Sequence, residues 1–189
     1  MNNVVITRSK NQILDISEMI TQLGMNPVEF PCIEIDSSSY KDSLYGELTN
    51  LNTYDWILFT SRNTIQVLNE IIIENQMDID WKKIKVGAIG PETKKMLINI
   101  FDVEHVFTPK IFNVKSFTDE LPIMPEEKIL VPQSKIADDS IVDNLKEKDI
   151  FVKKIIAYDL AVGTGGENVP KMLQENTVDA VIFTSGSTV

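Results

Sequence analysis

The chain has 189 residues, of which 43% are hydrophobic and 24% charged, values that suit a globular fold and exclude a disordered chain. Its formal net charge of −10 disfavours nucleic-acid binding, which needs clustered Lys and Arg, and requires that any anionic ligand be held by local donors. We expect a cytoplasmic protein for three reasons. The chain has a single cysteine, its N-terminus lacks a basic and then apolar signal segment, and no apolar run approaches the roughly 20 residues of a membrane helix.

Strand-like and helix-like patterns alternate along the whole chain. Residues 56–59 form a continuous apolar run, typical of a strand covered on both faces, and Ile65, Leu68 and Ile72 follow at helical spacing. Such alternation predicts an α/β fold with parallel sheets and helices on their faces. The predicted strands are 4–7, 28–35, 56–59, 84–89, 103–107, 128–131, 151–161 and 181–183.

The helix boundaries carry their own signals. Gly24 suits the left-handed residue after a helix, Ser61 suits an N-cap, and Pro91 suits the first helical position. Residues 163–166 are rich in glycine and predict a turn or hinge. The predicted helices are 13–23, 44–51, 65–72, a helix opening at 90–93, 112–121, 141–145 and 169–173.

Two stretches of the chain repeat at nearly equal offsets. Residues 4–10 resemble 129–135, and residues 55–61 resemble 179–185, with a shared Phe-Thr-Ser. Equal spacing makes coincidence improbable, so we expect an internal duplication. The second copy reaches Val189 just after its Thr-Ser turn, so we expect either that the polypeptide is longer or that another chain supplies the missing part.

Polar residues follow the predicted strands where each strand ends. In open parallel sheets ligands bind beyond the carboxyl ends of strands, and the N-termini of the following helices favour anions. Capping is the commoner role of any single hydroxyl there, but five such turns, two of them copies, predict an anion-binding cleft between two domains. The candidate binding residues are Arg8, Thr60, Ser61, Arg62, Asn63, Gly90, Glu92, Thr93, Gln133, Ser134, Lys135, Thr184, Ser185, Gly186 and Ser187.

The usual catalytic constellations are absent from the sequence. His105, the only histidine, lies in a predicted strand, so we expect it to have a structural or surface role. We expect Cys32 to pack as a small apolar group. No Cys and His spacing indicates a metal site, and no glycine-rich loop indicates a nucleotide. Asp138 and Asp139 suit the start of a helix, where negative charge complements the helix dipole. From its pattern alone, Tyr158 is a half-buried strand tyrosine with its hydroxyl in water.

Several segments, taken in order, resemble the uroporphyrinogen-III synthase family. The likeness runs over the whole chain, although Arg62 and Gly186 follow the Thr-Ser pairs where the family often has proline. Family members also usually continue for some tens of residues beyond the second Thr-Ser. The segments are Val-Ile-Thr-Arg within 4–8, Asp-Trp-Ile-Leu-Phe-Thr-Ser-Arg-Asn at 55–63, Val-Gly-Ala-Ile-Gly-Pro-Glu-Thr at 86–93, Ile-Ala-Tyr at 156–158 and Phe-Thr-Ser at 183–185.

The resemblance implies two parallel-sheet domains that do not coincide with the two copies. The first domain would take residues 1–35 and 165–189 and would be incomplete at the C-terminus. The second would take residues 38–158, with a two-stranded linker near 35–38 and 158–164. The implied activity is that of a monomeric lyase of tetrapyrrole biosynthesis, without cofactor or metal. It would cyclise hydroxymethylbilane to uroporphyrinogen III, with loss of water and inversion of the last pyrrole ring.

The same resemblance implies that Tyr158 is the acid for departure of the substrate hydroxyl. The strand-end turns would hold the carboxylates of the substrate, and Thr60, Ser61 and Thr93 are the foremost holders. Such chemistry depends mainly on positioning, which suits a sequence with no histidine- or cysteine-centred site. The alternative is a non-enzymatic, two-lobed module that binds an anionic metabolite or a protein, since the same turns would serve it. A copurifying tetrapyrrole would distinguish the two.

Overall fold

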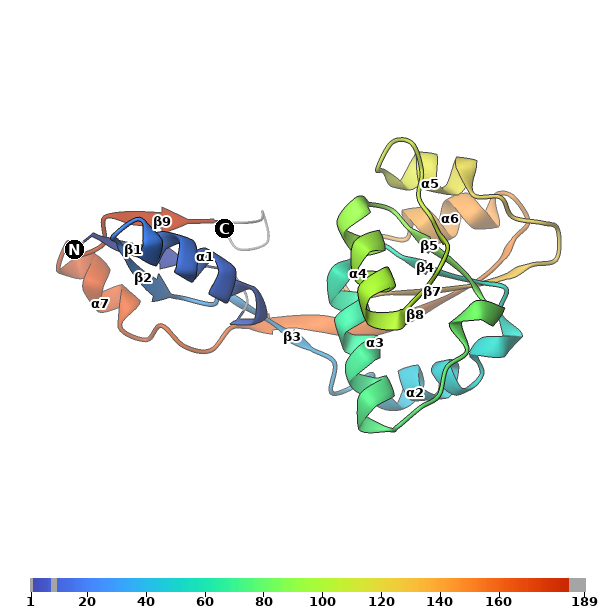
Figure 1. Ribbon diagram of the computed structural model, residues 1–189, viewed down its shortest axis with the longest axis horizontal. Helices are drawn as coiled ribbons and strands as arrows, with labels where there is room; N and C mark the ends of the chain where they lie inside the picture. The colour runs from blue at the N-terminus through green and yellow to red at the C-terminus, as the bar shows by residue number, and fades with distance from the viewer. Residues whose placement is uncertain (1, 8–9, 184–189) are drawn as a thin grey trace. The chain divides into compact units, whose positions relative to one another are not determined.

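The computed structural model describes residues 2–7 and 10–183 of the chain (Figure 1). The chain divides into two compact units. One comprises residues 1–36 and 160–189, and the other comprises residues 37–159. The strands pair in parallel wherever their register is given, which confirms the predicted α/β class with parallel sheets.

The first unit is built on a sheet of strands in the order β2-β1-β9. β1 (Asn3–Ile6) is central, and both β2 (Asn26–Glu29) and β9 (Ala180–Ile182) pair with it in parallel. Apolar residues of α1 (Lys10–Gln22), including Ile13 and Ile20, are buried against Val4 and Ile6 of β1. Gly24 follows α1 with φ +75°, the left-handed conformation predicted for it. This unit also contains α7 (Val169–Gln174).

The prediction of one strand over 28–35 is wrong. The segment forms two strands, β2 and β3 (Ile33–Asp36), with Phe30, Pro31 and Cys32 between them. Pro31 has no N–H to donate to a sheet, so it interrupts the pairing. The chain comes back beside this break, because the N–H of Gly163 donates to the carbonyl of Cys32 (3.0 Å). A Cβ at Gly163 would lie 1.9 Å from the Pro31 oxygen, so only glycine fits there.

The larger sheet has the strand order β3-β8-β7-β4-β5-β6. β7 and β4 lie at its centre, and two predicted strands differ from the observed ones by three residues each. The strand predicted over 103–107 is only β6, and the strand predicted over 128–131 extends to Ser134. The bounds are β4 (Trp56–Phe59), β5 (Lys85–Ala88), β6 (Val106–Phe107), β7 (Lys128–Ser134) and β8 (Phe151–Val162).

Helices cover both faces of this sheet (Figure 1). Two neighbours in β8 show the alternation, because Lys153 pairs with Glu47 of α2, whereas Lys154 pairs with Asp139 beside α6. α3 packs with both α2 and α4 on one face, and α5 and α6 pack on the other. The bounds are α2 (Lys41–Thr49), η1 (Leu51–Thr53), α3 (Arg62–Glu74), η2 (Trp81–Lys83), α4 (Pro91–Phe101), α5 (Val114–Glu120) and α6 (Ser140–Lys146).

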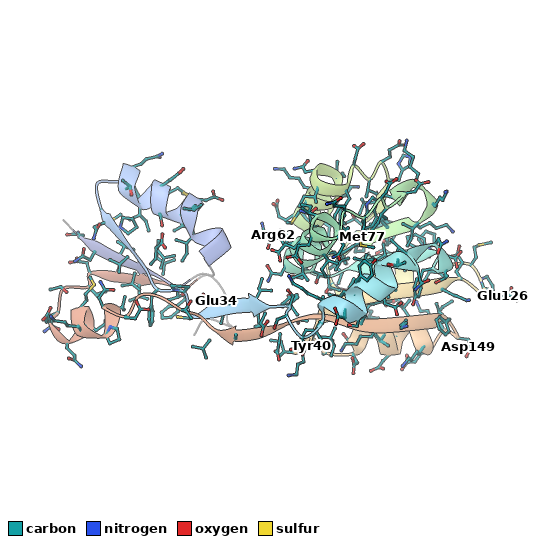
Figure 2. All side chains as sticks on the ribbon, turned by 90° about the horizontal axis from the view of Figure 1, so that it is seen from below. Glu34, Tyr40, Arg62, Met77, Glu126 and Asp149 are labelled. Carbon is teal, nitrogen blue, oxygen red and sulfur yellow. The ribbon has the colours of Figure 1, made fainter. Side chains whose placement is uncertain are left out.

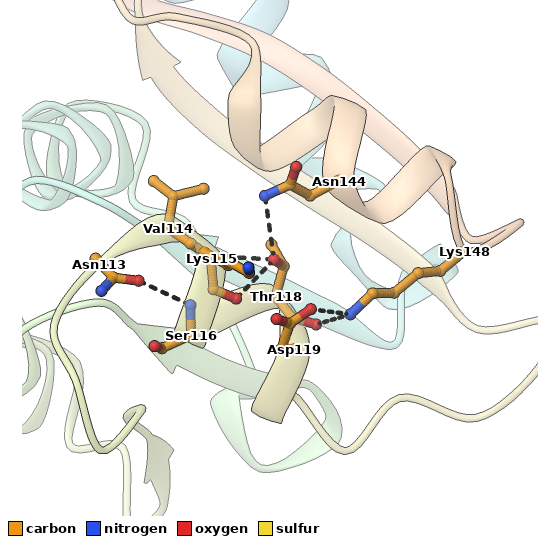
Figure 3. Close-up of polar contacts among 8 residues, drawn as sticks. All are labelled: Asn113, Val114, Lys115, Ser116, Thr118, Asp119, Asn144 and Lys148. Atoms are coloured by element: carbon orange, nitrogen blue, oxygen red, sulfur yellow. Dashed lines mark hydrogen bonds and ion pairs between the residues drawn. The ribbon is translucent and has the colours of Figure 1, made fainter.

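The face under α5 and α6 carries an apolar cluster of the second unit. Side chains of β4 and β7 pack there against Phe117 of α5 and Leu145 of α6. Figure 3 shows the polar contacts that join the two helices: the Lys148 ammonium donates to the carbonyl of Thr118 (2.7 Å) and to Asp119 (2.8 Å). Asn113 caps α5 by accepting from the N–H of Ser116 (2.8 Å). These contacts fix the layer behind the sheet.

Candidate functional site

Polar turns of the second unit lie at one edge of the larger sheet. β7, β4 and β5 are neighbours and run in parallel, so the segments that follow them leave from the same edge. The fold thus brings together turns that are up to 74 residues apart in sequence, from Thr60 to Ser134. The candidate residues placed at this edge are Thr60, Ser61, Arg62, Asn63, Gly90, Glu92, Thr93, Gln133, Ser134 and Lys135. The candidates Arg8, Thr184, Ser185, Gly186 and Ser187 lie outside the described residues.

Tyr158 is buried, and its hydroxyl lies 3.4 Å from the Oγ of Ser61. Only 4% of Tyr158 is exposed, so the interpretation of a half-buried tyrosine with its hydroxyl in water is wrong. Ser61 is the N-cap of α3, as predicted, and its Oγ accepts from the N–H of Asn63 (3.1 Å). The two residues come from different elements, β8 and the turn after β4, and their hydroxyls meet across the end of β7, which lies between those strands.

Lys135 is held beside Tyr158 by its backbone and its side chain. Its N–H donates to the carbonyl of Tyr158 (2.8 Å), and its ammonium pairs with Asp159 (2.6 Å). The hydrogen bond that the ammonium donates to Asp159 raises the pKa of Lys135, and the charge of Asp159 and the nearby Tyr40 add to the effect. The edge therefore carries an ammonium that stays protonated at neutral pH, beside a carboxylate that partly balances it.

The starts of α3 and α4 differ in what surrounds them. Gly90 caps α4 without a side-chain hydrogen bond, and nothing lies within 4 Å of where a Cβ at Gly90 would stand. Arg62 begins α3 and is exposed (Figure 2), as is Glu92 in the first turn of α4. Thr93 is buried against the body of the unit. The open helix starts offer N–H groups to an anion, whereas the Thr93 side chain is largely covered.

Gln133 lies on the opposite face of the sheet from Tyr158. Gln133 shares a face of β7 with Ile129 and Val131, which pack under α5 and α6, because side chains two residues apart in a strand point to the same side. Its neighbour Ser134 points to the other side and pairs with Tyr158. Gln133 is 4% exposed, and its Oε1 has no hydrogen-bond partner among the residues that the structure describes. The fold therefore places Gln133 at the predicted edge without bringing its side chain to the tyrosine.

Two residues beside the site were missed by sequence reasoning. Asp159 and Tyr40 both act on Lys135, and Tyr40 precedes α2 (Figure 2). The only available signal was that an acid directly follows Tyr158 in the sequence. The interaction of Lys135 with Tyr40 joins segments almost 100 residues apart, so no local sequence pattern predicts it.

The structure also places the histidine, the cysteine and the paired acids of the sequence. His105 is exposed and lies just before β6, so it is outside the strand predicted for it. Cys32 is partly buried, its thiol contacts the carbonyl of Phe30 (3.5 Å), and burial raises its pKa. Asp138 accepts from the N–H of Ser140 at the start of α6 (3.0 Å). Over residues 2–7 and 10–183, no group of three or more His, Cys, Asp and Glu side chains could hold a metal ion. In the same residues, no helix is long and apolar enough to cross a membrane.

A cavity of about 570 Å³ lies at the β6 side of the sheet, away from these turns. Its walls include Trp56, Trp81 and Phe107, and none of its lining residues is one of the candidate binding residues from the sequence. Two of its lysines are already paired, Lys82 with Glu104 (3.3 Å) and Lys85 with Glu127. The cavity is therefore largely charge-compensated and separate from the site around Tyr158.

Comparison with known proteins decides the family. The family HEM4, described as uroporphyrinogen-III synthase HemD, matches residues 15–189. The chain belongs to this family. It is 30% identical over 192 residues to a porphyrin biosynthesis protein HemD of Ruminiclostridium josui, and 31% identical over 153 residues to a putative uroporphyrinogen-III synthase of Methanocaldococcus jannaschii. These matches cover 98% and 80% of this chain, but only 38% and 61% of the relatives, respectively.

Solved structures of the family have the same fold. A mutant uroporphyrinogen III synthase of Thermus thermophilus matches all of this chain and 74% of its own, with a TM-score of 0.65 at 16% identity. The wild-type protein of the same organism matches with a TM-score of 0.56 at 18% identity. The resemblance inferred from the sequence is thus confirmed for the HemD family and for its α/β architecture.

Proposed function

We propose that the protein to which this chain belongs cyclises hydroxymethylbilane to uroporphyrinogen III, with loss of water and inversion of the last pyrrole ring. One observation carries the proposal: in a chain of the HemD family, a buried tyrosine hydroxyl meets a helix-capping serine at the carboxyl edge of a parallel sheet. Cofactor and metal have no part in the proposed reaction. The enzyme is a lyase of porphyrin biosynthesis, and its proposed location is the cytoplasm.

Tyr158 is the proposed acid for departure of the substrate hydroxyl. The electrons of the neighbouring pyrrole nitrogen expel this hydroxyl, so a weak acid in the right place suffices. The N–H of Asn63 donates to the Oγ of Ser61, which leaves the Ser61 proton able to point at the oxygen of Tyr158. The phenol proton is then free for the leaving hydroxyl. Ser61 thereby orients the donor and also caps the helix.

The turns at the same edge are the proposed holders of substrate carboxylates. The N-termini of α3 and α4 offer N–H groups, Thr60 and Ser61 offer hydroxyls, and Lys135 offers an ammonium. Glu92 can assist only through its N–H, because its carboxylate would repel the substrate. The other proposed contacts are Arg8, Arg62, Asn63, Gly90, Thr93, Gln133, Ser134, Thr184, Ser185, Gly186 and Ser187.

The domain organisation also remains a proposal. It assigns 1–35 with 165–189 to a first domain and 38–158 to a second, with linkers near 35–38 and 158–164. The duplication is supported by the strand order, because β2-β1-β9 has the same arrangement as β8-β7-β4. In this pairing the two matching sequence stretches occupy matching strands, β1 with β7 and β9 with β4. The proposed complete enzyme is a monomer.

The decisive test of the acid is Tyr158→Phe in an assay that supplies freshly generated hydroxymethylbilane. We expect kcat to fall about tenfold to hundredfold, near the lower range for general acid catalysis, and KM to stay within about twofold. Tyr45→Phe is the matched control, because Tyr45 is 44% exposed in α2 and its loss should change neither constant. A Tyr158→Phe enzyme with the full rate would remove Tyr158 from the mechanism.

A further inference from the structure

Strand β8 contains one extra residue opposite the end of β7. Gln133 pairs with Ile156, and the next residue, Ser134, pairs with Tyr158, so Ala157 has no partner in the register. This two-for-one count is a β-bulge, a feature that re-aims side chains and occurs often next to active sites. It interrupts a register that is otherwise regular from Lys128 onward.

The bulge decides the face from which Tyr158 projects. Before it, Lys153 faces α2 and Lys154 faces the start of α6, so even-numbered residues of β8 point toward α6. An unbroken register would therefore send Tyr158 toward α6, because a shift of one residue moves a side chain to the other face. The extra residue returns Tyr158 to the face that carries α3, where its hydroxyl reaches Ser61 (3.4 Å).

The contacts around the bulge hold this register. The N–H of Lys135 donates to the carbonyl of Tyr158 (2.8 Å), directly beyond the bulge. The ion pair between Lys135 and Asp159 (2.6 Å) closes the same two strands one residue further along. Ala157 is completely buried, and its small side chain leaves room for the local kink. The bulge is thus a packed and hydrogen-bonded feature.

We propose that the bulge at Ala157 is a positioning device for the reaction: it aims Tyr158 at Ser61 and at the substrate. This inference rests on the proposed function, because Ala157 acts only through Tyr158. Asp159 has a supporting role through Lys135, since its carboxylate helps to hold the end of β7 against β8. A surface ion pair of this kind contributes little to folding, so its value here is geometric.

The test gives Ala157 a partner, so that no bulge remains before Tyr158. In the moved-bulge protein, one alanine is inserted into β7 between Gln133 and Ser134, opposite Ala157, which makes the register regular through Tyr158 and turns its side chain toward α6. Ala157→Gly is the matched control, because it keeps the extra residue. We expect the moved-bulge protein to lose about as much kcat as Tyr158→Phe, about tenfold to hundredfold, whereas Ala157→Gly stays within about twofold of the unchanged protein.

A second readout follows the side chain without reference to activity. Tyrosine labelled with ¹³C at Cζ gives one signal for each of the four tyrosines, and Tyr158→Phe identifies the signal of Tyr158. Ser61→Ala should shift that signal in the unchanged protein and leave it unmoved in the moved-bulge protein. A signal that still responds to Ser61→Ala in the moved-bulge protein would overturn the proposal.

The two readouts separate this inference from the proposed function. If the signal uncouples from Ser61 but kcat does not fall, the bulge aims Tyr158 but Tyr158 does not catalyse, which overturns the catalytic role of the device. If the moved-bulge protein does not fold, amide exchange in the unchanged protein decides. The N–H of Lys135 should then be protected by its bond to Tyr158, and exchange as fast as in a free peptide would contradict the register.

Discussion

Ser61 joins folding and chemistry, so Ser61→Ala should change both by amounts that the structure sets. The hydroxyl accepts from the N–H of Asn63 (3.1 Å), and loss of such a cap costs about 1 kcal/mol, which lowers Tm by about 2–4 °C. The same hydroxyl lies 3.4 Å from that of Tyr158, a long hydrogen bond worth about 1 kcal/mol at most. In the transition state this corresponds to about a fivefold fall in kcat.

Asn113→Ala provides the matched control for this prediction. Asn113 caps α5 through the N–H of Ser116 (2.8 Å), and neither residue contacts Tyr158 in any hydrogen bond of the structure. It should lower Tm as much as Ser61→Ala and leave kcat unchanged. Thermal unfolding followed by circular dichroism gives Tm, and the coupled hydroxymethylbilane assay gives kcat. If Ser61→Ala and Tyr158→Phe multiply their effects on kcat as independent changes, the two hydroxyls do not act together and the reasoning is refuted.

Two further predictions concern stability alone. Gly87→Ala should destabilise the protein by about 1–3 kcal/mol in urea unfolding, because the new Cβ would lie 2.7 Å from Leu58 and 3.0 Å from Phe117. An unchanged urea midpoint would show that the core has room for the added methyl group. Burial alone would raise the pKa of Glu127, but hydrogen bonds from Lys85 and two N–H groups lower it below its usual range. A lowered pKa stabilises the fold above the pKa of the unfolded chain, and this contribution is lost as the pH falls below about 4.3. Glu127→Gln should therefore flatten the acid limb of the curve of stability against pH, and an unchanged limb would contradict that assignment.

Much of the fold was predictable because its determinants are local. The apolar run at 56–59 needs cover on both faces, and it became the central strand β4. Ser61 sits where an N-cap belongs, and it caps α3. Gly24 adopts the left-handed conformation after α1. Such features depend on a few neighbouring residues, so they can be predicted from the sequence.

The features that could not be predicted depend on distant partners. Nothing near Tyr158 in the sequence marks Ala157 as unpaired, because the bulge exists only relative to β7. The hydroxyl of Tyr158 meets that of Ser61, which is 97 residues away in the sequence. The break of the predicted strand 28–35 was partly visible in Pro31, but the close approach of Gly163 to it was not. Local patterns located the turns of the site, and the pairing of the strands decided which of them meet.

We propose that this chain belongs to an enzyme that inverts the last pyrrole ring of its substrate. The direct measurement supplies freshly generated hydroxymethylbilane to the polypeptide as its gene encodes it, oxidises the product and separates the type I and type III isomers. We expect type III to be the main product. The Tyr158→Phe protein should form type III more slowly, so that the share of type I, which arises spontaneously, increases. Type I alone from the unchanged protein would contradict the account and favour a module that only binds an anionic ligand.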